Sequence, residues 1–299
     1  MSQYLFYTLD VFTEQIFGGN PLAVFPQAEG LNTQQMQAIA QELNLSETVF
    51  VWPPEREDCD FKLRIFTPRT ELEFAGHPTV GTAYLLAHVG LVKPTIASVN
   101  LEEGVGKVPV TLTWQQESLV STALQAAQLP TFSDVPTTLD AAQLLNLTAE
   151  QIHQKLSAAV ISCGVPFLYI PLRDRQAVDE SMLNQTFWQN TLQGTDAANV
   201  YIFALEGDRQ IYARMFAPGL GIAEDPATGS AATSLAGYLH RYLDSSTGTQ
   251  TWQIEQGTKM GRPSSLMLTF SAGESGLTKI QVGGASVLVS QGEMTVREL

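Results

Sequence analysis

The sequence contains little cysteine, little positive charge and no long apolar run. Two of the 299 residues are cysteine, and two thiols in a chain of this length are more typical of a reducing compartment than of a disulfide framework. Lysine and arginine together number 16 against 30 acidic residues, for a formal net charge of −14. This negative charge argues against nucleic acid or an anionic membrane as a partner, since both are themselves negative.

The sequence also lacks the marks of a membrane span, a leader or a metal site. The longest weakly polar run, residues 80–92, is too short to cross a bilayer and includes His88. No basic stretch followed by an apolar one opens the chain, so we expect no signal peptide and a cytoplasmic protein. The 4 histidines form no H-x-x-x-H pair, and no dinucleotide glycine fingerprint occurs. We therefore expect neither a metal nor a bound dinucleotide.

What the chain does contain is one short passage twice. The pattern R-x-F-x-P at residues 64–68 is followed by H-P-x-x-G-T-A at residues 77–83. About 150 residues later R-x-F-x-P recurs at residues 214–218, followed by D-P-x-x-G-S-A at residues 225–231. A repeat of this length predicts two duplicated domains. We place them at residues 1–125 and 126–299, with the last strands able to pack back on the first domain.

The periodicity of apolar residues predicts the same elements in each half. Residues 78–87 form an expected helix that is apolar nearly all round, as is typical of a helix enclosed by a sheet, and Pro78 suits its first turn. A second helix is expected after Asn32, which with Gln35 forms a capping box. The sequence predicts an α+β fold of two pseudo-symmetric domains, each a curved, mostly antiparallel sheet around a central helix. Strands are expected at residues 4–12, 22–25, 48–52, 61–66, 108–114, 167–170, 200–204, 265–270, 277–282 and 285–288, and the second central helix at 229–240.

Each repeated motif opens one of the two central helices. The first N–H groups of a helix have no partner within it and favour an anion. Gly76, Gly81 and Gly229 would permit close approach of a ligand, and Thr82 and Ser230 could add hydroxyl donors. Both motifs could instead be no more than well-capped helix starts. Their repetition favours a shared pocket between the halves for a small anionic or zwitterionic substrate.

The difference between the two copies suggests acid/base chemistry. His77 occupies the place of Asp225, and a histidine with a carboxylate can orient a polar substrate or move protons. Glu47, just before an apolar strand, is a third candidate. From the residues alone we favour a solvated turn position for Glu47 over a catalytic one.

Several segments together resemble the PhzF family, the phenazine biosynthesis-like isomerases. The resemblance covers nearly the whole chain, and the segment at residues 224–231 is its most specific part. The other segments are residues 10–12 with 18–21, 46–48, 74–79, 164–167, and 256–257 with 260–263.

The resemblance implies the diaminopimelate-epimerase-like fold, with the site between two similar halves. Glu47 falls on the family's proton-shuttling glutamate, which reverses our preference for that residue. His77, Asp225, Gly229 and Ser230 fall on substrate-contacting positions, and Gly76 lies beside them. The implied reaction is a cofactor-independent isomerisation of a small cyclic or amino-acid-like carboxylate, and a homodimer is implied as well. In the phenazine enzyme the substrate is trans-2,3-dihydro-3-hydroxyanthranilate.

Two other functions remain open. Epimerases and racemases of this fold use two cysteines, but Cys59 and Cys163 lie outside both helix-start motifs, which disfavours that chemistry. A non-catalytic protein that binds small carboxylates would need the helix starts but not an acid/base group. The presence of Glu47, His77 and Asp225 together favours the isomerase.

Overall fold

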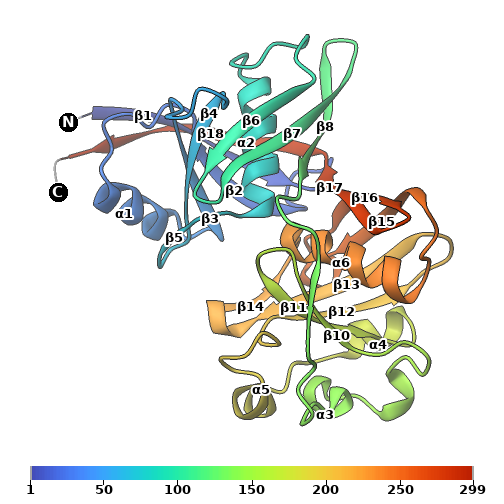
Figure 1. The fold of residues 1–299 in the computed structure, drawn as a ribbon. Helices are drawn as coiled ribbons and strands as arrows, with labels where there is room; N and C mark the ends of the chain where they lie inside the picture. The colour runs from blue at the N-terminus through green and yellow to red at the C-terminus, as the bar shows by residue number, and fades with distance from the viewer. Residues whose placement is uncertain (1, 298–299) are drawn as a thin grey trace. The chain divides into compact units, whose positions relative to one another are not determined.

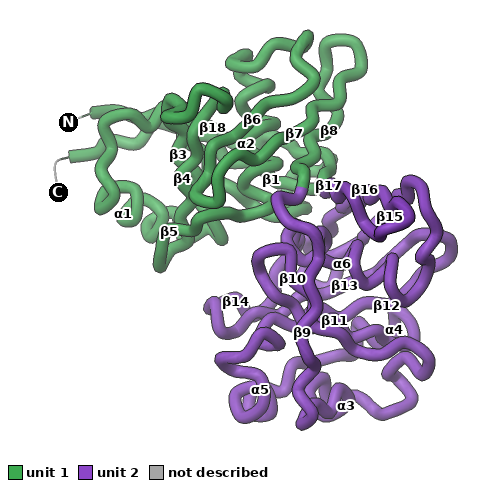
Figure 2. Tube along the Cα trace, in the orientation of Figure 1, with its two compact units in different colours: residues 1–125, 283–299 green, residues 126–282 purple. Residues whose placement is uncertain are grey.

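The computed structural model describes residues 2–297, and the chain divides into two compact units (Figure 2). Unit 1 comprises residues 1–125 and 283–299, and unit 2 comprises residues 126–282. The chain thus leaves unit 1 once, builds unit 2, and returns to unit 1 for its last strand.

Unit 1 is built on a curved sheet in which antiparallel pairs predominate. Its strands are β1 (Ser2–Val11), β2 (Asn20–Phe25), β3 (Glu47–Trp52), β4 (Phe61–Phe66), β5 (Glu71–Leu72), β6 (Ser98–Glu103), β7 (Gly106–Gln115), β8 (Ser118–Gln125) and β18 (Ser286–Val296). β1 pairs antiparallel with both β2 and β18, and β6, β7 and β8 form an antiparallel series. The β2–β3 and β4–β6 pairs are parallel.

The helix α2 (Gly76–His88) lies in the concave side of this sheet and contacts β1, β2, β7 and β8 (Figure 1). Nearly all of its side chains are buried, as its uniformly apolar sequence predicts. A side chain at Gly81 could not fit, since a Cβ there would lie 2.5 Å from Val11 Cγ2 and 2.7 Å from Leu22 Cδ2. Gly81 therefore serves helix–sheet packing, a different use from the ligand approach that we expected.

A smaller helix, α1 (Thr33–Leu43), covers another part of unit 1. Asn32 caps it, and the reciprocal bonds with Gln35 confirm the predicted capping box. Beneath it the rings of Phe25 and Phe50 stack with centroids 4.9 Å apart, and Phe66 meets Phe50 edge-on at 5.6 Å. These aromatic side chains pack β2, β3 and β4 against one another. Glu47 lies on β3, the middle strand of the three.

Unit 2 repeats this plan with more helix on its outer side. Its strands are β9 (Thr131–Ser133), β10 (Ala159–Ser162), β11 (Pro166–Pro171), β12 (Val200–Leu205), β13 (Gln210–Ala217), β14 (Ile222–Asp225), β15 (Gly248–Gln256), β16 (Ser264–Gly273) and β17 (Gly276–Gly284). The helix α6 (Gly229–Tyr242) is the counterpart of α2 and packs on β10, β11 and β16. Three short helices, α3 (Ala141–Leu145), α4 (Arg175–Glu180) and α5 (Gln185–Thr191), are additions that the sequence patterns did not predict.

The strand registers show the duplication residue by residue. In unit 1, Thr48 of β3 faces Phe66 and Phe50 faces Arg64; in unit 2, Val200 of β12 faces Phe216 and Ile202 faces Arg214. The β11–β12 pair is parallel like β2–β3, and β13–β15 is parallel like β4–β6. The predicted α+β fold of two similar halves is confirmed.

The repeated R-x-F-x-P segment has a structural role in both units. Arg64 donates two hydrogen bonds of 2.7 Å to Glu71 and lies over the Phe66 ring. Arg214 donates two bonds of 2.8 Å to Glu224 in the same way and also bonds the Ser181 carbonyl. A planar guanidinium suits this bidentate geometry, so each arginine ties its strand to the next short strand and fixes the segment that leads to the central helix.

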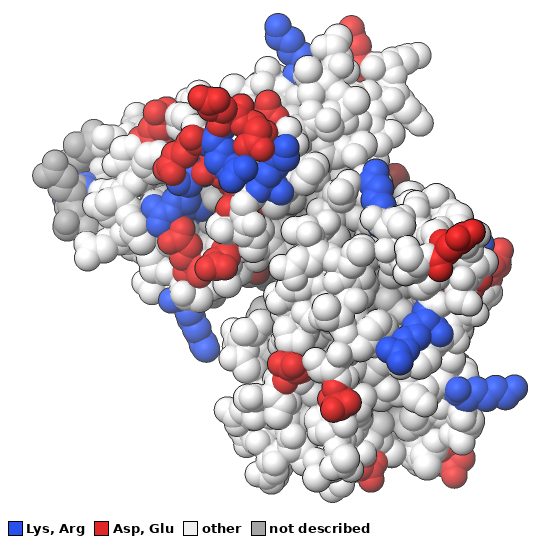
Figure 3. Space-filling view, viewed as in Figure 1, with Lys and Arg blue, Asp and Glu red and all other residues white. Residues whose placement is uncertain are grey.

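Charged side chains gather on one part of unit 1, where both signs are interspersed (Figure 3). Lys62 pairs with Glu55 at 2.6 Å, and Asp58 lies 3.0 Å from Arg56 and 3.2 Å from Lys107. Their mutual pairing makes this a solvated, balanced cluster. No helix within residues 2–297 has both the length and the apolar character needed to cross a membrane.

Candidate functional site

In unit 1 the predicted residues meet where β3 begins and α2 begins. Glu47 is the first residue of β3, and Gly76 and His77 are the first two of α2. The β2–β3 register places Glu47 opposite Leu22, which directly follows Pro21 in β2. Glu47 is 8% exposed and His77 6% exposed, so the solvated interpretation of Glu47 is wrong.

Glu47 and His77 touch through their polar ends. Glu47 Oε2 lies 3.3 Å from His77 Nε2. The distance would suit an ion pair, but the alignment is not that of a hydrogen bond. We interpret the contact as a carboxyl group beside an uncharged imidazole, because burial lowers the pKa of His77 to about 3.

A backbone contact holds the imidazole of His77. The ring bonds the Pro21 backbone, and proline offers only a carbonyl there, so the ring donates. Nε2 faces Glu47 and makes no hydrogen bond, which leaves Nδ1 as the donor to Pro21. The neutral ring is thereby fixed with Nε2 as an acceptor directed at Glu47.

Thr82 lies farther along α2 and is 0% exposed. Its hydroxyl is among the buried polar atoms within residues 2–297 that make no hydrogen bond. Its role as a substrate donor stays a prediction. Gly76 is buried at the helix start, where its N–H has no acceptor within the helix.

In unit 2 the corresponding turn holds Asp225, Gly229 and Ser230. Asp225 ends β14 and is 6% exposed, and its Oδ2 accepts a bond of 2.5 Å from the Thr228 hydroxyl. Gln256 bonds the Asp225 carbonyl at 2.8 Å and the Thr228 hydroxyl at 3.0 Å. Gly229 is buried at the start of α6, and Ser230 is half-buried beside it. The turn before α6 is therefore held by side chains as well as by its backbone.

Sequence reasoning missed Gln256, which hydrogen-bonds the Asp225 turn, and Tyr201, whose hydroxyl is influenced by the charge of Asp225. Gln256, fully buried at the end of β15, was noted only as part of a family pattern. Tyr201, one position past the start of β12, is also fully buried, and burial together with the nearby charge of Asp225 raises the pKa of its hydroxyl. The following Gly257, at φ +77°, allows the close approach of Pro226, whose carbonyl would lie 2.5 Å from a Cβ there. No local pattern signals the bonds of Gln256, which join residues 28 and 31 positions apart.

The two units differ where Glu47 stands. By register its counterpart is Asn199, which precedes Val200 of β12 and donates a bond of 3.0 Å to the Pro166 carbonyl. An amide cannot serve as an acid or base, so only unit 1 places a carboxyl group at this position.

Neither cysteine is placed as a catalytic thiol. Cys59 lies in the charged segment between β3 and β4, and burial raises its pKa. Cys163 lies between β10 and β11, where burial raises its pKa to about 12. Both thiols stay protonated at neutral pH, whereas the two-thiol chemistry of a racemase needs a thiolate.

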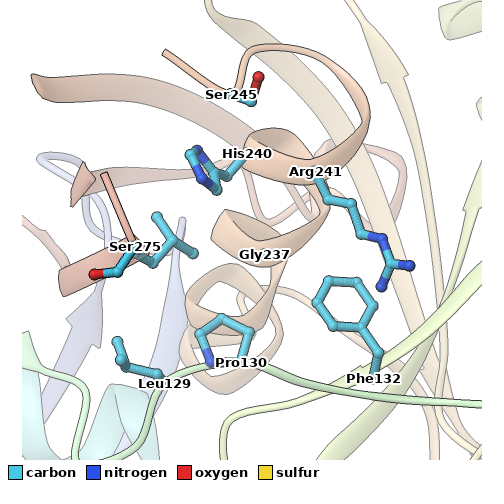
Figure 4. Close-up of a pocket in the computed structure, with 9 residues that line it drawn as sticks. Leu129, Pro130, Phe132, Gly237, His240, Arg241, Ser245 and Ser275 are labelled. Atoms are coloured by element: carbon cyan, nitrogen blue, oxygen red, sulfur yellow. The ribbon is translucent and has the colours of Figure 1, made fainter. Parts of the chain in front are cut away.

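An open cavity of about 500 Å³ occurs in unit 2 at the opposite end of α6 from Ser230. Figure 4 shows the Arg241 guanidinium over the ring of Phe132, with Pro130 against Gly237 and His240 on the other side of the helix. None of the predicted site residues lines this cavity.

Comparison with known proteins identifies the family. The profile of the phenazine biosynthesis-like proteins, PhzC-PhzF, matches residues 9–292. The chain belongs to this family. An uncharacterized isomerase of Mesorhizobium japonicum is 36% identical, with 98% of each chain covered. The trans-2,3-dihydro-3-hydroxyanthranilate isomerase of Pseudomonas chlororaphis is 33% identical over 96% of this chain and 98% of its own.

A solved structure shows the same fold. The phenazine biosynthesis protein of the PhzF family from Bacillus anthracis superposes with a TM-score of 0.89 at 24% identity, covering 99% of this chain and all of its own. The predicted family, fold and enzyme class, an isomerase, are thus confirmed. The roles of individual residues stay predictions.

Proposed function

We propose that this PhzF-family isomerase moves a proton between two carbons of a small cyclic or amino-acid-like carboxylate, without a cofactor. The observation that carries the proposal is the buried contact of Glu47 with an uncharged His77 at the start of α2. A relative that matches this chain over nearly its full length supports the substrate class, because the Pseudomonas chlororaphis protein is a trans-2,3-dihydro-3-hydroxyanthranilate isomerase.

Glu47 would serve first as base and then as acid. Its carboxylate takes a proton from a carbon next to an unsaturated bond, so one C–H bond breaks and its electron pair shifts along the conjugated system. The protonated Glu47 then returns that proton to another carbon, where a new C–H bond forms. The substrate keeps its composition and its oxidation level, so the step needs no further reactant.

The neutral state of His77 suits this cycle. A charged imidazolium would pair with the Glu47 carboxylate and stabilise it against taking a proton. Because burial keeps the imidazole uncharged, the contact leaves the basicity of Glu47 in place. His77 Nε2 can instead accept a hydrogen bond from a substrate hydroxyl or amino group near Glu47.

The substrate carboxylate would be bound by backbone N–H groups at a helix start. Gly76 supplies one in unit 1, and Gly229 with the Ser230 hydroxyl would supply others in unit 2. We propose that Asp225 also contacts the substrate, so Asp225→Asn should lower the rate of exchange.

The test is solvent exchange followed by NMR. The protein is incubated in D2O with trans-2,3-dihydro-3-hydroxyanthranilate and a panel of cyclic and aromatic-precursor amino and hydroxy acids. Deuterium entry together with double-bond movement supports the proposal. Thermal-shift binding without exchange in any member would favour a carboxylate-binding protein instead. Light scattering of the same sample tests the further expectation of a homodimer.

A further inference from the structure

The hairpin of β6 and β7 places an acidic side chain in the interior of unit 1. Glu103, the last residue of β6, is 5% exposed. Its Oε1 lies 2.7 Å from the Thr79 hydroxyl oxygen on the first turn of α2. Its Oε2 is buried and makes no hydrogen bond with any described residue. No role follows for this residue from the proposed reaction.

A proton on Glu103 satisfies both short contacts of the Thr79 hydroxyl. Thr79 Oγ1 lies 2.7 Å from the Ala75 carbonyl oxygen as well as 2.7 Å from Glu103 Oε1. A hydroxyl has one proton, and a carbonyl has none. Both contacts are satisfied when Thr79 donates to Ala75 and the Glu103 carboxylic acid donates to Thr79. Burial favours the same state, since it raises the pKa of Glu103 to about 8.

This chain of bonds ends on a peptide group of the candidate site. The Ala75 carbonyl and the Gly76 N–H belong to one planar trans peptide unit, so they point in opposite directions. A bond that fixes the carbonyl therefore fixes the direction of the N–H. Gly76 N–H is the first donor of α2 and directly precedes His77.

We propose that Glu103, as an uncharged carboxylic acid, is a positioning residue that aims the Gly76 N–H through Thr79 and the Ala75 carbonyl. We call the bonds from Glu103 through Thr79 to the Ala75 carbonyl the hydrogen-bond relay. The link from this relay to substrate binding rests on the proposed function, whereas the relay itself is independent of it. Glu103 acts on the helix start through Thr79.

Ionisation of Glu103 would break the relay. A carboxylate is the stronger acceptor and would take the single Thr79 proton. The Ala75 carbonyl would keep only the Thr79 N–H, at 3.3 Å. The orientation of the Ala75–Gly76 peptide should therefore loosen as pH rises through about 8.

Other charged groups near the hairpin have partners or face elsewhere. Glu102 accepts the N–H groups of Glu55 and Arg56 at 2.8 and 2.9 Å. On the neighbouring strands, Lys107 of β7 pairs with Asp58 and Lys62 of β4 pairs with Glu55.

The remaining titratable groups lie on either side of the α2 start. Glu73, on the segment before α2, is exposed, and its backbone contacts Gly104 and Val105. His77 stays neutral above about pH 3. Only burial and Thr79 shift the pKa of Glu103, so its titration can be assigned to one group.

The relay is tested by the 13C shift of the Ala75 carbonyl between pH 6 and 10. We expect the wild-type shift to move with a midpoint near 8, to stay flat in Glu103→Gln, and to move as in wild type in Glu102→Gln. Thr79→Val should abolish the movement, and Thr79→Ser should restore it. A flat wild-type profile, or an unchanged one in Glu103→Gln, overturns the proposal.

A second arm separates the relay from the proposed reaction. If the Gly76 N–H binds substrate, kcat/KM for exchange should fall about tenfold from the plateau by pH 9 in wild type, since it follows the protonated fraction of the free enzyme. Glu103→Gln should lose that alkaline fall and keep the neutral rate within a few fold. An identical fall in both proteins contradicts a positioning role. Absence of exchange in wild type at every pH contradicts the proposed function while the carbonyl shift still decides the relay.

Discussion

His77 Nε2 lies 3.3 Å from Glu47 Oε2, yet the imidazole is uncharged because burial lowers its pKa to about 3. The pair joins the first residue of β3 to the second residue of α2. In unit 2 the corresponding strand position holds Asn199, bonded to a proline carbonyl as His77 is. The fold therefore repeats the scaffold in both units but places a carboxyl group at this strand position in unit 1 and an amide in unit 2.

The charge state of His77 can be measured directly. Its folded pKa is depressed, so the native ring should stay neutral as pH falls from 7 to 5, whereas an unfolded histidine takes a proton near 6.5. We expect the 15N ring signals of His77 to show an Nδ1–H tautomer throughout that range. The same protein in denaturant provides the control. A titration of the native ring between pH 5 and 7 would mean that it forms an ion pair with Glu47.

The raised pKa of Glu103 predicts that the free energy of unfolding falls as pH rises. Its pKa is raised from 4.5 to about 8 in the folded state, so its favourable contribution is complete below pH 4.5 and is lost as pH rises toward 8. One such proton changes the free energy of unfolding by about 1.4 kcal/mol per pH unit at most. The free energy of unfolding, measured with denaturant between pH 5 and 8, should decline less steeply with pH in Glu103→Gln than in Glu102→Gln. Parallel profiles for the two variants would show that Glu103 ionises normally when folded.

The two repeated arginines should differ in importance. The Arg214 and Glu224 side chains are 8% and 16% exposed, whereas Arg64 and Glu71 are 24% and 38% exposed. Arg214→Ala leaves a buried acid without its partner and should cost about 3–5 kcal/mol of unfolding free energy. Arg64→Ala should cost about 1 kcal/mol, as for a more exposed pair. Equal losses in chemical denaturation would show that burial does not govern these bonds.

The sequence predicted those parts of the fold that depend on local pattern. A helix start needs a cap, a proline or a glycine at fixed positions, so α2, α6 and the Asn32–Gln35 box could all be located. The helices α3, α4 and α5 are too short to show a periodicity.

Contacts between distant residues could not be predicted in this way. Glu103 and Thr79 are 24 residues apart, and two adjacent acids at a strand end suggest a solvated turn. Glu47 shows the same limit, since its burial depends on how β3 meets α2. Family resemblance placed it in the site when the local pattern did not.

The central claim is that Glu47 moves the proton, and one paired measurement tests it most directly. Deuterium exchange into the substrate and substrate affinity are measured for wild type and Glu47→Gln in the same D2O buffer. Gln keeps the shape of the side chain but cannot carry the proton, so exchange should fall about a hundredfold or more while the dissociation constant changes by less than about threefold. Exchange that persists in Glu47→Gln, or that falls only in step with affinity, would contradict the account.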